Sequence, residues 1–430
     1  MHDRFYLGDK LSQKDDAINL HRMLRGKIEI KSRISLETLF ENNDEVEKGT
    51  LGLIYTPNVA YVSREISANK ELAYDYTSKW NNVAIVCDGS RVLGLGNIGP
   101  EAAIPVMEGK SVLFKILGGI NAFPLCLATQ DKEELVRFVK AIEPMFGAIN
   151  VEDIESPKVL DIVKRLQQDL SIPVFHDDQH GTAVITLAAL VNALKLVNKR
   201  LDRIGVVVAG SGSAGYGIFR ILYEAGCRDI TVTDSKGAIY AGREDFSIRS
   251  NDKSTNSYKQ EIAEKTNPVK SKGDLQRVIK GKDVFIGVSG KGGILSESIV
   301  KSMSPDAIVF ALSNPDPEIL PHDALRAGAK IVSTGRSDFA NQVNNAVVFP
   351  SFLRALLDLR IKTLSEDMLV AVAYAIAGLI DDEHLKTDYV VPKLNDPRIL
   401  SIVTKTLKET ISEHLKDKDS KNKEYKGTTA

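Results

Sequence analysis

Cysteine, net charge and long apolar runs are all scarce in this chain of 430 residues, and each shortage excludes a class of protein. The three cysteines are scattered and form no CxxC pair, so they predict neither a disulfide framework nor a thiolate metal site. The formal net charge is −1, which argues against a nucleic-acid partner because such proteins normally carry a basic face. No run of about 18 apolar residues occurs, so a membrane partner is not expected either.

Both ends of the chain are polar. The first residues, MHDRFYLGDKLSQKDD, lack the apolar core of a signal peptide, and together with the cysteine content they predict a cytoplasmic protein. The last residues, KDKDSKNKEYKGTTA, contain few apolar side chains, so we expect a flexible tail over residues 416–430.

Strands and helices alternate in the first half of the chain. FPLCLA precedes the helical KEELVRFVKAI, GAINVED precedes SPKVLDIVKRLQQDL, and IPVFHDD precedes TAVITLAALVNALKLV. This alternation predicts right-handed βαβ units and a parallel sheet. Upstream, NVAIVCDGSRVLGLG predicts two short strands around an Asp-Gly turn.

A nucleotide-binding pattern opens the second half. GSGSAG matches GxGxxG, follows the apolar run IGVVVA, precedes the helical YGIFRILYEAG and leads to a strand that ends in an acidic residue. In this context the glycines permit a tight turn and a close approach to a pyrophosphate at a helix N-terminus. The context disfavours the alternative, a glycine-rich turn without a ligand. The expected cofactor-binding residues are Gly210, Ser211, Gly212, Ser213, Ala214, Gly215 and Asp234.

The choice between NAD and NADP stays open. Asp234 can accept from the ribose hydroxyls and favours NAD, since a 2′-phosphate would meet its charge. Ser235 and Lys236 are the next two residues in the sequence, and their side chains could bind that 2′-phosphate instead.

The fold class predicted by these patterns is α/β with two domains. An N-terminal α/β domain for substrate and metal is expected over residues 1–190. A Rossmann-type NAD(P)-binding domain is expected over residues 191–350, followed by C-terminal helices over 351–415. The polar stretch from about 245 to 275 predicts a surface excursion.

Carboxylates follow two neighbouring predicted strands of the first domain. Glu152 and Asp153 end one strand, and Asp177 and Asp178 end the next. The carboxyl ends of parallel strands meet at one edge, so Glu152, Asp153 and Asp178 are expected to converge. Carboxylates held together call for a hard cation, Mg²⁺ or Mn²⁺. The alternative is that they only cap helices. A zinc site on His176 and His180 is rejected, because the i, i+4 spacing binds metal only within a helix.

Seven motifs in one order resemble the malic enzyme family, in its short bacterial and archaeal type. They are YTPNVAYVSREI, RVLGLGNIGPEAAIPVMEGKSVLFK, INVEDI, VFHDDQHGTAV, the GxGxxG strand, ALSNP and NQVNNAVVFPS, which span roughly residues 45 to 385. The resemblance implies oxidation of malate, decarboxylation and release of pyruvate, with oxaloacetate decarboxylation as a further activity. It also implies NAD or NADP, Mg²⁺ or Mn²⁺, and a homodimer or larger homo-oligomer.

The resemblance also implies roles for individual residues. Lys110 corresponds to the general base, with a pKa that burial and the metal would have to lower. Tyr55 corresponds to the acid that protonates C3 of enolpyruvate. Arg91, Asn314 and one of Asn344 and Asn345 correspond to substrate contacts, and Asn314 also to a nicotinamide contact. Asp177 corresponds to a residue near the metal or a helix cap.

Three other functions remain as alternatives. Malolactic chemistry would use the same residues with tightly held NAD and lactate as product. An amino-acid dehydrogenase of the glutamate type shares the two-domain logic and a catalytic lysine, but it needs no metal. A non-catalytic nucleotide-sensing scaffold is disfavoured, because the lysine, the tyrosine and the carboxylates occur together.

Overall fold

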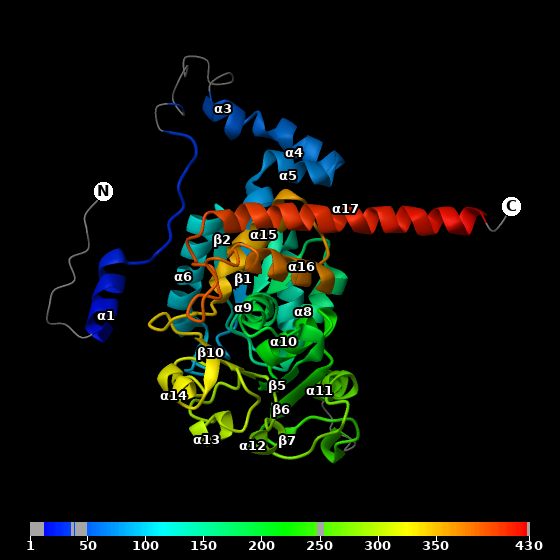
Figure 1. Cartoon of the computed structure of the whole chain (residues 1–430). Helices are drawn as coiled ribbons and strands as arrows, with labels where there is room; N and C mark the ends of the chain where they lie inside the picture. The colour runs from blue at the N-terminus through cyan, green and yellow to red at the C-terminus, as the bar shows by residue number, and fades with distance from the viewer. Residues whose placement is uncertain (1–12, 36–37, 39–49, 247–252, 428–430) are drawn as a thin grey trace.

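A computed structural model describes residues 13–35, 38, 50–246 and 253–427 (Figure 1). Two sheets of mainly parallel strands form the body. The strands of the first sheet all come from the N-terminal half of the chain. Its strand order is β2-β1-β3-β4. The elements are β1 (Asn82–Cys87), α6 (Pro100–Gly118), β2 (Asn121–Cys126), α7 (Lys132–Ile142), β3 (Ala148–Val151), α8 (Lys158–Asp169) and β4 (Val174–His176). The predicted βαβ alternation is confirmed.

The segment after β1 differs from the prediction. Only one strand forms, and the chain beyond the Asp-Gly turn is a loop closed by a single bridge between Val92 and Gly96. RVLGLG contains two glycines and pairs with no neighbouring strand, so its apolar residues do not extend the sheet. The loop is thereby free to reach the second sheet.

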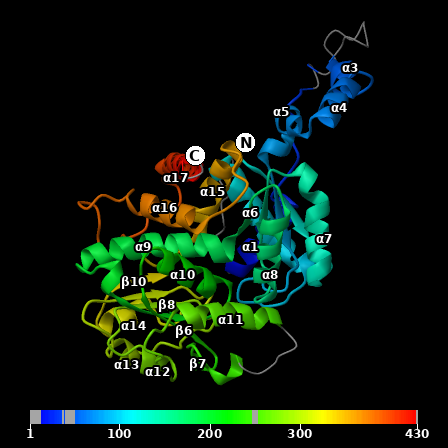
Figure 2. The same ribbon diagram turned by 90° about the vertical axis from the view of Figure 1, so that its right-hand side faces the viewer.

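The second sheet has the order β10-β9-β8-β5-β6-β7, with only β7 antiparallel. Helices cover both of its faces (Figure 2). The elements are β5 (Gly205–Ala209), α10 (Ser213–Glu224), β6 (Asp229–Asp234), β7 (Gly237–Ala238), α11 (Lys253–Lys265), α12 (Leu275–Val278), β8 (Val284–Gly287), α13 (Glu297–Val300), β9 (Ala307–Ala311), α14 (Pro321–Arg326) and β10 (Ala329–Thr334). This is the Rossmann-type arrangement expected from the glycine-rich pattern.

The polar stretch after residue 245 is not merely a surface excursion. It contains α11, on which Tyr258 is 7% exposed and Ile262 is fully buried. The apolar residues are few because a helix that covers one side of a domain needs only one apolar stripe. α11 therefore holds its polar side chains at defined places beside the sheet.

The C-terminal helices connect the two halves. α9 (Thr182–Leu196) lies between the sheets and packs on α10 and on α16 (Glu366–Ala377), while α15 (Phe349–Asp358) packs on α6. The stretch expected as a flexible tail is helical up to Gly427, since α17 (Arg398–Gly427) continues through it and projects beyond the body in Figure 1. Lysine and glutamate are good helix formers, and no glycine or proline interrupts the stretch before Gly427.

The N-terminal helices stand away from the body. α3 (Thr50–Ile54) and α4 (Val59–Ala68) project from it in both views (Figures 1 and 2), and α4 has no buried residue. α5 (Ala73–Tyr76) joins them to the body, where Asp75 accepts from Arg360 at 2.6 Å. Large apolar side chains remain exposed on this arm: Leu53, Ile54, Tyr55, Tyr61 and Val62. None of the described helices is both long and apolar enough to span a membrane.

Candidate active site

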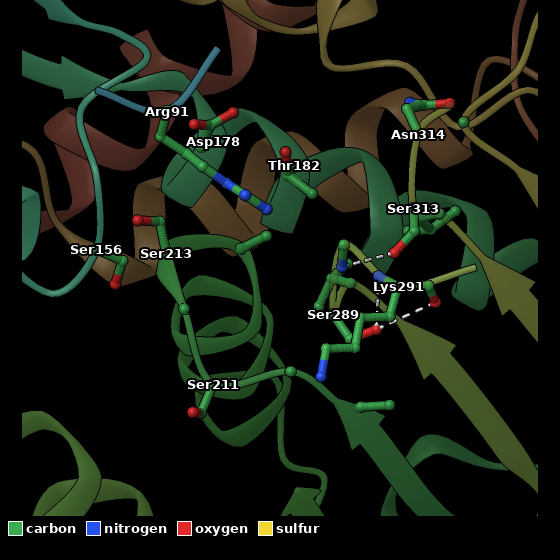
Figure 3. A pocket seen from close by; sticks show the side chains of 18 of the residues that line it. Arg91, Ser156, Asp178, Thr182, Ser211, Ser213, Ser289, Lys291, Ser313 and Asn314 are labelled. Atoms are coloured by element: carbon green, nitrogen blue, oxygen red, sulfur yellow. Dashed lines mark hydrogen bonds between the residues drawn. The ribbon is translucent and has the colours of Figure 1, made fainter. Parts of the chain in front are cut away.

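A cleft of about 1170 Å³ lies where the two sheets face each other with their carboxyl ends (Figure 3). The strands of each sheet end there, so the loops that follow them supply the lining. The structure brings together most of the predicted site residues at this cleft: Arg91, Lys110, Glu152, Asp153, Asp178, Gly210, Ser211, Gly212, Ser213, Ala214, Asp234, Asn314, Asn344 and Asn345. Tyr55, Asp177 and Gly215 are not among the lining residues.

Lys110 lies at the centre of the acidic side of the cleft. Its Nζ donates to Asp177 Oδ2 at 2.6 Å and forms an ion pair with Glu152, and the ring of Phe349 lies 4.6 Å away. Burial alone would lower the pKa of Lys110, but Asp177 and Glu152 outweigh burial and hold it above its ordinary value. The lowering expected from burial and a metal together is not tested by this arrangement, in which Asp177 and Glu152 favour the charged form of Lys110.

Asp177 lies beneath Lys110 rather than on the cleft wall. It is fully buried, and burial first of all raises its pKa to about 7. A Cβ at Gly181 would stand 2.0 Å from Asp177 Oδ1, so only glycine fits at that position. The turn from Asp177 to Gly181 thus folds tightly back on itself and delivers this carboxylate to the lysine.

Asp153 is the most crowded of the carboxylates. It is 7% exposed, and its Oδ2 has no hydrogen-bond partner among the described residues. Burial, then the charges of Glu152 and Asp178, raise its pKa to about 8. A buried acceptor without a donor beside two like charges is the environment that a cation relieves.

The carboxylates of the cleft are not arranged as the ligands of a metal ion. Among the residues that the structure describes, no three histidine, cysteine or acidic side chains lie close enough together to hold an ion. Glu152 is drawn towards Lys110 instead. The donor set nevertheless fits a hard divalent cation, because carboxylate oxygens are its preferred ligands and Asp153 Oδ2 is unpartnered.

The two histidines beside these aspartates are buried and neutral. Burial lowers the pKa of His176 to about 4 and that of His180 to about 3. Nδ1 of His180 accepts the backbone N–H of His176 at 3.1 Å, across the turn that joins β4 to α9. The i, i+4 pair therefore does not share one α-helix, in agreement with the rejection of a zinc site.

The glycine-rich loop has the geometry that the pattern predicts. Gly210 has a φ of 121°, and a Cβ there would lie 2.7 Å from the carbonyl oxygen of Val288. A Cβ at Gly215 would lie 1.9 Å from the oxygen of Gly210, so this glycine allows the helix to pack on the strand. α10 begins at Ser213, and Figure 3 shows Ser211 and Ser213 at its cleft end.

Asp234 ends β6, as expected, but its carboxylate is already engaged. Arg243 donates to both oxygens, at 3.1 and 2.6 Å, and Lys259 Nζ donates at 2.6 Å. The backbone N–H of Lys236 donates at 2.9 Å. Burial would raise the pKa of Asp234, but the bonds from Arg243 and Lys259 hold it at about 2.

Arg91 and the asparagines line the cleft from different segments of the chain. The Arg91 guanidinium lies against Gly290, where a Cβ would be 2.6 Å from Nη2. Oδ1 of Asn344 accepts the N–H of Ala346 at 2.9 Å and caps a short helix, whereas Asn345 has no such role. Asn345 is therefore the better candidate for a substrate contact.

Two residues near the cofactor side were not predicted. Glu318 is fully buried and accepts from the backbone N–H and the hydroxyl of Ser313. Lys259 lines the cleft from α11. No local motif predicts either residue. Glu318 acts through the neighbouring Ser313 loop, and Lys259 belongs to the segment that was expected to lie on the surface.

Tyr55 does not line the cleft of its own chain. It follows α3 on the exposed arm, and its side chain is 70% exposed. A catalytic acid in this position would need the cleft of another molecule.

Taken together, a Rossmann-type sheet with a glycine-rich loop, faced by a buried lysine among carboxylates, defines a nicotinamide-dependent oxidoreductase. Residues 33–136 match the family described as "Malic enzyme, N-terminal domain", and residues 179–410 match "Malic enzyme, NAD binding domain". The chain belongs to the malic enzyme family.

Named relatives agree with this membership. The chain is 46% identical to the bifunctional malic/malolactic enzyme of Bacillus subtilis over 94% of each chain. It is 46% identical to the NAD-dependent malic enzyme of Geobacillus stearothermophilus, over 89% of this chain and 76% of the relative. The crystal structure of the NAD-dependent malic enzyme of Thermotoga maritima superposes with a TM-score of 0.83, at 43% identity, and the match covers 91% of this chain and 99% of that one.

Proposed function

We propose that the chain oxidises malate and decarboxylates the product, releasing pyruvate and carbon dioxide with reduction of NAD or NADP, and that it also decarboxylates oxaloacetate. The observation that carries the proposal is the buried Lys110 ammonium, held by Glu152 and Asp177 on the cleft wall that faces the dinucleotide loop. A group that moves the C2 hydroxyl proton has to stand across the cleft from the nicotinamide.

The proposed roles follow from the contacts. Lys110 can accept the hydroxyl proton once Glu152 has been drawn to other partners, because that ion pair helps to raise its pKa. Arg91 and Asn345, which both line the cleft, hold the substrate carboxylate, since a guanidinium binds a carboxylate through paired donors. Asn314 contacts substrate and nicotinamide from the loop after β9.

We propose Glu152, Asp153 and Asp178 as ligands of Mg²⁺ or Mn²⁺. Such an ion supplies Lewis-acid polarisation of the C2 oxygen and stabilises the enolate. Asp177 keeps its bond to Lys110 and positions the amine.

We propose further that the enzyme is a homodimer or a larger homo-oligomer in the cytoplasm. The arm that bears Tyr55 exposes adjacent large apolar side chains, Leu53 at 56% and Ile54 at 42%. Exposed apolar residues grouped on a projecting arm are typical of an interface. We propose that this arm enters the cleft of a second copy, where Tyr55 protonates C3 of enolpyruvate. We further propose residues 1–190 and 191–350 as the two catalytic domains.

A malolactic activity is the second candidate, since the Bacillus subtilis relative is named for both reactions. That reaction returns the hydride to the product, so lactate forms without net change in the cofactor. The same residues would serve, provided that the dinucleotide stays bound between the two hydride transfers.

One assay separates these candidates. Purified chain is incubated with malate, Mn²⁺ and either NAD or NADP, and reduced cofactor, pyruvate and lactate are measured together. We expect reduced cofactor and pyruvate in equal amounts. Lactate without reduced cofactor would favour malolactic chemistry, and no product with either cofactor would contradict both. Lys110→Ala should abolish turnover, whereas Lys115→Ala, an exposed lysine on the same helix, should not.

A further inference from the structure

The adenosine end of the cleft carries a cluster of charges that the family membership does not explain. The strand-end acid of a Rossmann fold selects NAD when its oxygens accept the ribose hydroxyls. An ionised carboxylate has about four lone-pair positions. In Asp234 four donors take them: the N–H of Lys236, two nitrogens of Arg243 and Nζ of Lys259. The side chain is only 6% exposed, so it has little capacity left for a ribose.

Asp234 lines the cleft beside Lys259, but its lone pairs are taken, so Lys259 is the group of this pair with donors to spare. Lys259 lines the cleft, is 27% exposed and has Asp234 as its partner among the described residues. An ammonium has three donors, and the bond to Asp234 uses one of them. Lys236 follows the strand end and is 66% exposed.

The nearby acids do not cancel this effect. Asp245 pairs with Arg243 at 2.7 Å and with Lys236 at 3.3 Å. Asp274, which also lines the cleft, caps α12 by accepting the N–H of Arg277 at 3.0 Å. Each acid is thus held by a donor of its own, and Lys259 keeps two donors that its bond to Asp234 does not use.

We propose that Lys259, supported by Lys236, binds the 2′-phosphate of NADP, and that the chain uses NADP at least as well as NAD. The inference rests on the proposed nicotinamide cofactor. The 2′-phosphate accepts from the free donors of Lys259, while Arg243 keeps its two bonds to Asp234. For NAD the Asp234 carboxylate has no free lone pair, so the ribose hydroxyl gains no strong bond from it. α11, which sequence patterns placed on the surface, supplies the selecting residue.

Two measurements test the proposal, and the first needs no turnover. Binding of 2′,5′-ADP and of 5′-AMP to the full chain is compared by calorimetry. We expect 2′,5′-ADP to bind about tenfold tighter or more, because charge-assisted bonds to a phosphate are worth that factor. Equal or weaker binding of 2′,5′-ADP would overturn the proposal, whatever the chain does to malate.

The second measurement compares variants. In Lys259→Gln the preference for 2′,5′-ADP, and the ratio of kcat/KM for NADP to that for NAD, should each fall about tenfold. Lys265→Gln makes the same charge change on the same helix, where Lys265 pairs with Glu261, and should leave both ratios unchanged. A loss of stability cannot imitate this result, because it affects both cofactors alike. An unchanged ratio in Lys259→Gln, or an equal fall in both variants, would overturn the role of Lys259.

Discussion

Gly94 lies directly against Pro315, across the cleft. A Cβ at Gly94 would stand 2.5 Å from Cδ of Pro315 and 3.1 Å from the carbonyl oxygen of Asn314. The loop after β1 thus touches the loop after β9, beside residues proposed to bind substrate. The absence of a side chain at Gly94 lets the two walls come together.

Gly94→Ala should therefore keep the walls apart. The added methyl costs about 1–3 kcal/mol if nothing moves, so the cleft should open instead and kcat/KM for malate should fall about tenfold. Steady-state kinetics measures the loss. Gly378→Ala adds a methyl with only ordinary contacts, at 3.5 Å from Tyr374 O, and should leave the kinetics unchanged. Equal kinetics in both variants would count against this contact.

Tyr55 and Lys110 should complement each other between subunits. Tyr55→Phe and Lys110→Ala proteins should each be nearly inactive in pyruvate formation. Mixed after dissociation and reassembly, they should regain activity, because some clefts then combine an intact lysine with an intact tyrosine from the other copy. The readout is pyruvate formation against mixing ratio, with each variant mixed with itself as the control. No recovery from mixtures shown to contain hybrid oligomers would contradict the proposed arm.

Asp153→Asn should stabilise the metal-free protein while removing activity. The substitution removes a charge that burial, and then repulsion from Glu152 and Asp178, make unfavourable, as the raised Asp153 pKa reflects; the melting temperature without metal should therefore rise by about 2 °C. It also removes a proposed ligand, so Mn²⁺, which we expect to raise the melting temperature of the unaltered protein, should no longer do so in the variant. Scanning calorimetry with EDTA or with Mn²⁺ measures both effects. A lower melting temperature in EDTA would argue against crowding of these carboxylates.

Stability should fall in mild acid because of His180. Its folded pKa of about 3 lies below the ordinary 6.5, so the unfolded chain binds the proton first as the pH falls. The contribution is complete above about pH 6.5 and declines by about 1.4 kcal/mol per pH unit below it, towards pH 3. His180→Asn should flatten the fall in unfolding free energy between pH 6.5 and 5, in urea titrations. His384→Asn, at an exposed histidine, should not.

Glu318 should hold two loops of the cofactor wall. It accepts from Ser313 of one loop, and the Ser313 hydroxyl accepts the N–H of Gly290 from the other at 2.9 Å. Glu318→Gln turns an acceptor into a donor against backbone N–H groups, which costs about 1–3 kcal/mol. KM for the cofactor should rise about threefold to tenfold, more than kcat falls. Glu297→Gln, in a surface ion pair with Arg326, serves as the control.

The sequence predicted those parts of the fold and site that local patterns encode. The alternation of strands and helices and the GxGxxG context gave both sheets, and the carboxylates at strand ends were expected at one cleft. Both predictions rest on periodicity and on the common direction of parallel strands.

What the sequence did not predict depends on contacts between distant segments. The four donors around Asp234 come from its own loop, from Arg243 and from α11, and no local pattern reports that a carboxylate is already satisfied. The raised pKa of Lys110 likewise depends on two carboxylates that follow other strands. Motifs identified which residues belong to the site, whereas the state of each residue required the fold.

The ring of Phe349 beside the Lys110 ammonium ties the acidic wall to the C-terminal helices. On a ribosome these two residues emerge far apart in time, since translation adds about 5–20 residues per second. The lysine, its carboxylates and the whole first sheet are therefore exposed to the cell before the aromatic ring exists. A nascent chain stopped between Asp178 and Phe349 would carry every acidic residue of the centre and still lack the aromatic ring beside its amine.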